Sequence, residues 1–260
     1  MFMQTDNLPR LTPDTALFLD FDGTLVALAP QPELVEVAPG LTSILAALHR
    51  QFNGALALVS GRRLLDLDVF LAPLQLPAAG EHGAQRRTAD GLLISAPPAD
   101  MRHVLQAAVD LVARHPALKL ERKNLAFSLH YRQAPELEGL CMQVMGDALA
   151  RSEGIDLMQG KCVIDLKPAG FSKGTAITFF MTEAPFAGRL PVFAGDDVTD
   201  EAGFEAVQRM GGHAIKVGDG PTVARHRCAS VARLAGWLQS AATGQSTVGH
   251  SAFGPTGLSA

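Results

Sequence analysis

The sequence is short of cysteine, of charge and of long apolar runs, and each shortage excludes a class of protein. The three cysteines, Cys141, Cys162 and Cys228, are odd in number, far apart and without CxxC spacing. They therefore predict no disulfide framework and fit a reducing compartment. Charged residues make up 18% of the chain and the net charge is -4, so we expect no basic surface for nucleic acid.

Membrane and secretion signals are missing as well. No apolar run approaches the roughly 18 residues of a membrane span, and the N-terminal sequence MFMQTDNLPR lacks the apolar segment of a signal peptide. We expect a cytoplasmic protein with no membrane or nucleic-acid partner, and we expect a monomer. Residues 241–260 are rich in Gly, Ser, Thr and Ala without an apolar period, and they predict a flexible tail.

The chain is rich in hydrophobic residues, at 47%, which is enough for a sizeable core. Short apolar runs without alternation, separated by helical segments, predict a parallel sheet that is buried on both faces. They occur in residues 14–84 and 167–240, which together predict an α/β, doubly wound, Rossmann-like core. The expected strands are 17–21, 54–60, 77–79, 190–197 and 213–217; the expected helices are 40–50, 64–71, 174–181, one from Asp200 and one near Trp237.

The segment between these two parts, residues 85–166, has a different pattern. Its first stretch, AQRRTADGLLIS, contains an Ala-Asp-Gly turn signal and predicts a hairpin. From Phe127 to Arg132 apolar and polar residues alternate, which predicts an antiparallel strand with one polar face. We also expect helices over 99–114 and 135–152 and strands over 155–158 and 162–166. The segment therefore predicts a smaller α+β cap domain inserted into the core.

Polar side chains follow the expected core strands, at the edge where open α/β sheets bind their ligands. Asp20 and Asp22 follow the first strand, Ser60 follows the second, and Asp196 follows the strand LPVFAG, while Lys173 stands just before a helix. An ordinary polar loop or helix cap explains any one of these positions. Since the strand ends of a parallel sheet meet at one edge, the set as a whole predicts a single site.

The acids in this set suit a magnesium site. Oxygen ligands without His or Cys favour Mg²⁺ over zinc, and Mg²⁺ takes one or two carboxylates with waters and a substrate phosphate. Asp20 with Asp196 fits this role. Asp22 lies two residues after Asp20, on the same side of an extended chain. Near a carboxylate and a phosphate dianion its neutral form is favoured, which suits a general acid. A carboxylate can also act as a covalent nucleophile.

Four motifs carry a resemblance to a known superfamily. DFDGT, VSGR, SKG and GDDVTDE resemble the four motifs of the haloacid dehalogenase (HAD) superfamily of phosphotransferases. Within that superfamily the chain is similar to the trehalose-6-phosphate phosphatases, through GEHGAQRR, AFSLHYRQAP, QGKCVIDLKP and GDDVTDEAGF. The resemblance covers about residues 16–237.

The resemblance implies an enzyme of trehalose biosynthesis, a Mg²⁺-dependent phosphatase that hydrolyses trehalose 6-phosphate to trehalose and phosphate through a phospho-aspartate. It implies that Asp20 is the nucleophile and a metal ligand. Asp22 would be the acid/base and would give its backbone carbonyl to the metal, and Asp196 would complete the coordination. Ser60 and Lys173 would hold the phosphoryl oxygens.

The resemblance also implies that the cap supplies the sugar contacts, at positions that match Lys123, Arg132 and Asp165. Many members of the family have Glu where this chain has Asp165, and the shorter acid reaches less far. We expect His82 and His130 to lie in the same groove in structural roles. Asp200 would act behind the metal ligands or through water.

The core motifs leave alternatives open. One is a phosphatase for another sugar phosphate, such as sucrose 6-phosphate, and another is a phosphomutase; only the cap separates these from the first interpretation. A third is a sensing module that is phosphorylated on Asp20 without turnover. Asp22 argues against the third alternative, since a phospho-acceptor needs no acid/base two residues further on.

Overall fold

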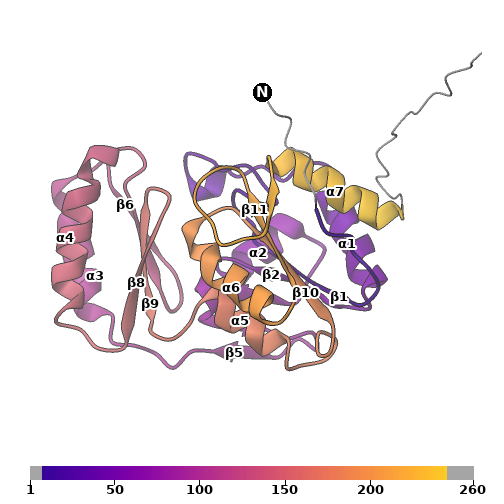
Figure 1. Cartoon of the computed structure of the whole chain (residues 1–260). Coiled ribbons are helices and arrows are strands. Elements are labelled where there is room, and N and C mark those ends of the chain that lie inside the picture. Colours follow the sequence, from indigo (N-terminus) through magenta and orange to yellow (C-terminus); the bar gives the residue numbers. More distant parts are fainter. Residues whose placement is uncertain (1–7, 245–260) are drawn as a thin grey trace, which may run out of the picture.

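Two separate sheets organise the chain in a computed structural model, which describes residues 8–244 (Figure 1). The larger sheet has eight strands in the order β12-β11-β10-β1-β2-β3-β4-β5. The strands from β12 to β3 are parallel, and β4 and β5 form an antiparallel hairpin at the edge. The strands are β1 (Thr15–Leu19), β2 (Leu56–Val59), β3 (Ala78–Gly80), β4 (Gln85–Arg87), β5 (Leu93–Ser95), β10 (Leu190–Gly195), β11 (His213–Val217) and β12 (His226–Cys228).

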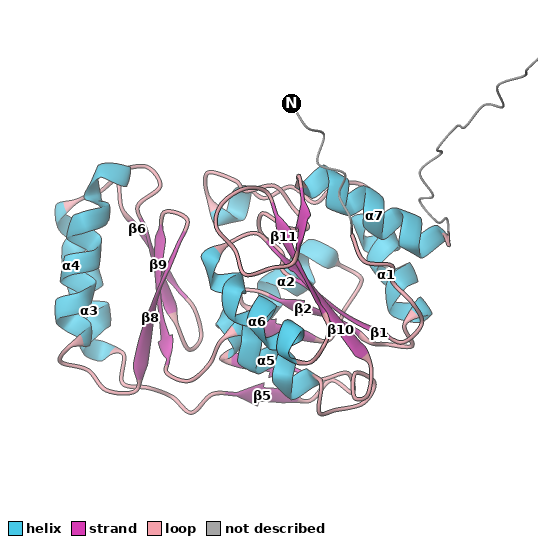
Figure 2. Ribbon diagram, in the orientation of Figure 1, coloured by secondary structure: helices cyan, strands magenta, loops and turns pink. Residues whose placement is uncertain are grey.

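Helices cover both faces of this sheet (Figure 2). Phe18 and Phe193 are register partners on β1 and β10, and Phe18 contacts Phe180 while Phe193 contacts Phe204, so α5 and α6 share one face. The crossover from β1 to β2 runs the opposite way along the sheet, which puts α1 on the other face, where it packs with α7. The helices are α1 (Leu41–Gln51), α2 (Leu64–Leu71), α5 (Lys173–Phe180), α6 (Glu201–Arg209) and α7 (Val231–Thr243).

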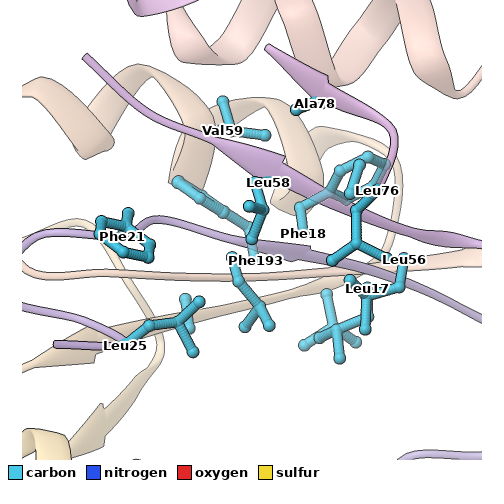
Figure 3. Close-up of a cluster of buried hydrophobic side chains, with 14 of the residues drawn as sticks. Leu17, Phe18, Phe21, Leu25, Leu56, Leu58, Val59, Leu76, Ala78 and Phe193 are labelled. Carbon is cyan, nitrogen blue, oxygen red and sulfur yellow. The ribbon is translucent and has the colours of Figure 1, made fainter. Parts of the chain in front are cut away.

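The central strands are buried on both faces, as their unbroken apolar runs predict. All five residues of β1 are buried. Figure 3 shows Leu17 and Phe18 of β1 among Leu56 and Leu58 of β2 and Phe193 of β10. Since neither face of the central strands β1, β2 and β10 meets water, the polar residues that they position lie just beyond the strand ends, which is where the site is built.

The smaller sheet is antiparallel, in the order β6-β7-β9-β8. Its apolar face packs on two helices, and Phe127 and Leu129 belong to that second core. Figure 1 shows these helices on the side away from the larger sheet, so the polar face looks toward it. The elements are β6 (Lys119–Arg122), β7 (Phe127–His130), β8 (Ile155–Gly160), β9 (Val163–Pro168), α3 (Arg102–Arg114) and α4 (Glu138–Leu149). Short 3-10 helices cover Pro32–Leu34, Pro135–Leu137 and Val198–Asp200, and Glu81–Gly83 form a tight turn with non-helical backbone angles.

The hairpin expected at the start of the insert forms, but it belongs to the larger sheet. β4 pairs antiparallel with β3 through Ala78, Ala79 and Gly80, and β5 pairs with β4. The tight turn at Glu81–Gly83 returns the chain directly onto the free edge of β3. The turn signal predicts which strands pair with each other, and it carries no information about the sheet that they join. The domain boundaries at residues 84 and 166 remain predictions.

The structure differs from the sequence-based expectations in three other places, namely β6, β12 and the end of α7. β6 and β12 were not expected, because the sequences KLER and HRC are polar and brief. Helix α7 continues to Thr243 and ends at Gly244, whose φ of 70° is left-handed, so the first residues of the expected tail are helical. The rest of the segment 241–260 lies outside the described residues. None of the described helices is long and apolar enough to cross a membrane.

Two leucines test the assignment of the core. Leu45 on α1 is 0% exposed and Leu65 on α2 is 64% exposed. Leu45→Ala should lower the free energy of unfolding by about 2–5 kcal/mol, because it leaves a cavity. Leu65→Ala, the matched control, should change it by no more than about 0.5 kcal/mol. Urea unfolding measures both, and equal losses would contradict the burial described here.

Candidate active site

A pocket lies between the carboxyl ends of the core strands and the polar face of the smaller sheet. Its empty space is about 1100 Å³ when the solvent-open mouth is included. All eight residues singled out from the sequence line it, namely Asp20, Asp22, Ser60, Lys123, Arg132, Asp165, Lys173 and Asp196. The structure thus brings together residues from both ends of the chain and from the insert.

Asp20 lies at the centre of the core side. It directly follows β1 and is 3% exposed. Its Oδ1 accepts a hydrogen bond from Lys173 Nζ at 2.7 Å, and its Oδ2 accepts one from the Thr24 hydroxyl at 3.1 Å. Lys173 is the first residue of α5, where the capping box of Ser172 and Thr175 fixes the start of the helix. The helix start therefore aims the lysine at the acid.

Asp196 and Asp200 complete an acidic cluster with Asp20. One oxygen from each of the three lies within 4.8 Å of the others. Asp200 accepts the second hydrogen bond of Lys173, at 2.7 Å, and also the backbone N–H groups of Asp196 and Asp197, at 3.0 and 2.9 Å. It thereby shapes the loop that presents Asp196 to the pocket.

Gly23 makes room for this cluster. Its φ is 79°, and a Cβ at this position would lie 2.3 Å from the Asp196 carboxyl carbon. A side chain would be strained by the backbone and would collide with the acid. The glycine of the DFDGT motif is therefore required by close approach.

The three carboxylates of the cluster carry more negative charge than the two lysines that contact them, Lys173 and Lys161, can offset. Burial raises the pKa of Asp20 well above its usual range, and although Lys173 opposes this rise, Asp200 and Asp196 add to it. Burial also raises the pKa of Asp196, against the pull of Lys161, whose Nζ lies 2.6 Å from its carboxylate. Burial alone would lower the pKa of Lys173, but Asp20 and Asp200 raise it above its ordinary value. An all-oxygen cluster with excess negative charge fits a hard divalent cation.

Asp22 lines the same pocket but is held differently from Asp20. Its two oxygens accept hydrogen bonds from Arg62 Nε and Nη2 at 2.6 and 2.7 Å. The guanidinium lies over the rings of Phe21 and Phe70, at 5.6 and 4.7 Å from their centroids. Arg62 was not singled out from the sequence, although it is the last residue of the VSGR motif. Ser60, two residues earlier, is buried at the end of β2.

The cap side of the pocket centres on Lys123 and Asp165. Lys123 Nζ donates to the Gly61 carbonyl at 2.8 Å and lies 3.4 Å from Asp165 Oδ1. Asp165 is buried, is hydrogen-bonded by the Ser128 hydroxyl, and has its Oδ2 3.2 Å from His82 Nε2. Burial alone would raise the pKa of Asp165, but Lys123 and His82 hold it below its usual range.

Arg132 and the two histidines lie around this centre. Arg132 is exposed and donates to the Lys161 carbonyl at 3.0 Å. His130 lies 2.8 Å from Glu121 Oε2. His82 is buried, and its Nδ1 has no hydrogen-bond partner among the described residues. Two further residues, Lys161 and Glu81, were not predicted from the sequence to belong to the site, because each contacts residues that are far away along the chain. Glu81 directly precedes His82.

Comparison with known proteins gives this arrangement a family. The trehalose-phosphatase family model matches residues 18–234. The chain is 43% identical over 233 residues to the trehalose-6-phosphate phosphatase of Escherichia coli (strain K12), covering 89% of this chain and 88% of that protein.

Solved structures share the fold. The C-terminal domain of trehalose-6-phosphate phosphatase from C. albicans superposes with a TM-score of 0.79 at 20% identity, over 90% of this chain and 98% of that one. The HAD-superfamily phosphatase BT1666 from Bacteroides thetaiotaomicron gives 0.60 at 17% identity, over 93% and 100%. The expected fold class, an α/β core with a large, mainly parallel sheet, is confirmed. With the family match over residues 18–234, the chain belongs to the trehalose-phosphatase family, a family of phosphoric monoester hydrolases.

Proposed function

We propose that this chain hydrolyses trehalose 6-phosphate to trehalose and phosphate, with Asp20 as a covalent nucleophile and Mg²⁺ as the cofactor. The observation that carries the proposal is the placement of Asp20. The acid is buried at a strand end, is hydrogen-bonded to Lys173 at 2.7 Å, and lies in a pocket whose opposite wall is the polar face of the cap. Membership of the trehalose-phosphatase family supports the choice of substrate.

The reaction has two steps. In the first, an Asp20 oxygen attacks phosphorus, the bond from phosphorus to the sugar oxygen breaks, and Asp22 donates a proton to the departing sugar. In the second, Asp22 takes a proton from water as that water attacks phosphorus, and the bond to Asp20 breaks. In the structure both Asp22 oxygens accept hydrogen bonds from Arg62, which orients the ionised carboxylate that serves as the base of the second step. For the first step, one Asp22 oxygen would have to leave Arg62 in order to carry the proton that goes to the sugar.

Positive charge and hydrogen bonds stabilise the phosphoryl group as it is transferred. Lys173 and Ser60 would hold its oxygens, with the lysine offsetting charge that builds up in a loose transition state. Mg²⁺ would be held by Asp20, Asp196 and the backbone carbonyl of Asp22, with Asp200 behind them. When bound, it neutralises charge on the cluster and on the phosphoryl oxygens.

The cap would recognise the sugar. Lys123, Arg132 and Asp165 all line the pocket. Lys123 and Arg132 offer hydrogen-bond donors to hydroxyl groups. Asp165 is engaged by His82, Ser128 and Lys123, so its proposed contribution to sugar binding passes through the orientation of Lys123. A monomeric state and a cytoplasmic location remain predictions.

Substitution of Asp20 tests the covalent step. Asp20→Asn keeps the shape of the side chain but removes its charge, so turnover should fall by at least about 1,000-fold, as for other nucleophile deletions. Asp147→Asn, an exposed acid on α4, is the matched control and should keep full activity. Phosphate release measures both. If a folded Asp20→Asn enzyme kept a tenth of the activity, covalent catalysis by Asp20 would be refuted.

Metal and substrate are tested together. Phosphate release is measured from trehalose 6-phosphate, sucrose 6-phosphate and glucose 6-phosphate, with Mg²⁺ and with excess chelator. We expect turnover of trehalose 6-phosphate alone, lost with chelator and restored by Mg²⁺, because the acidic cluster carries excess negative charge. Turnover confined to sucrose 6-phosphate, or spread over all three sugars, would overturn the assignment of the cap. Full activity in chelator would overturn the metal site.

A further inference from the structure

The turn after β3 has a backbone that the proposed reaction does not explain. Glu81, His82 and Gly83 have φ values of 51°, 56° and 98°, so three consecutive residues are left-handed and two of them are not glycine. Residues other than Gly, Asn, Asp and His rarely adopt this conformation, so Glu81 in particular is held in it by its surroundings. Both Glu81 and His82 are buried.

The backbone of this turn is tied to the loop that carries Ser60. The N–H of His82 donates to the Ser60 carbonyl at 3.0 Å, and the N–H of Glu81 donates to the Arg62 carbonyl at 2.9 Å. The carbonyl between them, that of Gly61, accepts the hydrogen bond of Lys123 from the cap. Three successive carbonyls of the proposed phosphate-binding loop are thus bound, two by the turn and one by the cap.

The side chain of Glu81 crosses from the core to the cap. Its carboxylate accepts three consecutive backbone N–H groups, those of Asn124, Leu125 and Ala126, at 3.2, 2.8 and 3.0 Å. These residues follow Lys123 in the turn between β6 and β7. Glu81 is 0% exposed. A buried carboxylate needs such donors, and these come from the cap.

His82 makes a second contact between the core and the cap. Its Nε2 lies 3.2 Å from Asp165 Oδ2 on β9 of the cap. The neighbouring Gly61 leaves room for the ring, since a Cβ there would lie 2.5 Å from that nitrogen. The left-handed turn thus sends two successive side chains to the two cap positions that flank the pocket.

We propose that Glu81 is a positioning residue, a latch that holds the β6–β7 turn on the core and so places Lys123 beside the phosphate-binding loop. His82 supports the latch through Asp165. The inference rests on the proposed function for the role of Lys123 in binding substrate. The latch itself is a contact between the core and the cap, so it can be tested without measuring turnover.

Amide hydrogen exchange tests the latch directly. Glu81→Gln keeps the size of the side chain but loses its charge and one acceptor oxygen. Exchange at residues 124–126 should become at least about tenfold faster, since these N–H groups lose a charged acceptor. The matched control is Glu33→Gln, which breaks an exposed contact between core and cap, the ion pair with Lys119 at 2.7 Å. It should leave exchange at residues 124–126 unchanged.

Steady-state kinetics separate positioning from general damage. For trehalose 6-phosphate, Glu81→Gln should raise KM at least about tenfold with a smaller change in kcat, because Lys123 is displaced. For p-nitrophenyl phosphate, which needs the core alone, kcat/KM should stay within about threefold of the wild-type value. An equal loss on both substrates, or an effect no larger than that of Glu33→Gln, would overturn the proposal.

A second variant and a second readout distinguish failure of the latch from failure of folding and from failure of the proposed function. If Glu81→Gln does not fold, Glu81→Asp replaces it, since Asp tolerates the left-handed backbone and keeps the charge but is too short to reach the amides. It should give the same exchange and KM changes, and wild-type behaviour in this variant would overturn the latch. If the wild-type enzyme hydrolyses only p-nitrophenyl phosphate, the proposed function fails, and hydrogen exchange at residues 124–126 still decides for or against the latch.

Discussion

The structure depends on one electrostatic constraint, the burial of three carboxylates around the buried Lys173 at the edge of the core sheet, with the half-exposed Lys161 on Asp196. Asp20, Asp196 and Asp200 would repel one another without Lys173, which donates to two of them at 2.7 Å. Burying such charges costs several kcal/mol each unless they are paired, so the surrounding chain is built to hold them in place. Asp20 directly follows a fully buried strand, Gly23 leaves room for the Asp196 carboxylate, and Lys173 lies at the capped start of a helix.

The core and the cap present their polar groups to the pocket in different ways. The central core strands β1, β2 and β10 are apolar on both faces, so the polar groups that they position lie beyond the strand ends. The antiparallel cap sheet has a whole polar face to offer, which carries Ser128 and Asp165 opposite the core. In our proposal the residues at the strand ends carry out phosphoryl transfer, and the residues on the polar face of the cap sheet bind the sugar.

The sequence predicted the parts of the site that follow from local pattern. Apolar runs located the core strands, and the residues after them, such as Asp20, Ser60 and Asp196, line the pocket together. Alternation placed Phe127 and Ser128 on opposite faces of the cap sheet. Contacts between distant segments could not be predicted, because spacing does not show what a side chain meets across a domain boundary. Examples of such contacts are the hydrogen bonds of Glu81 with the cap and those of Arg62 with Asp22. The pairing of the β4–β5 hairpin with the larger sheet is another.

The loop at Ser60, Gly61 and Arg62 has a further consequence for the catalytic cycle. Its first and third carbonyls are bound within the core, whereas the middle one is bound by Lys123 of the cap. Any opening of the cap in the proposed cycle would take Lys123 away from the Gly61 carbonyl and so remove the central hydrogen bond of this loop. In our proposal the loop binds phosphate through Ser60, so inorganic phosphate would be bound more tightly with the cap closed than with the cap open. Opening of the cap and release of phosphate would thereby depend on the same hydrogen bond, that of Lys123 with Gly61.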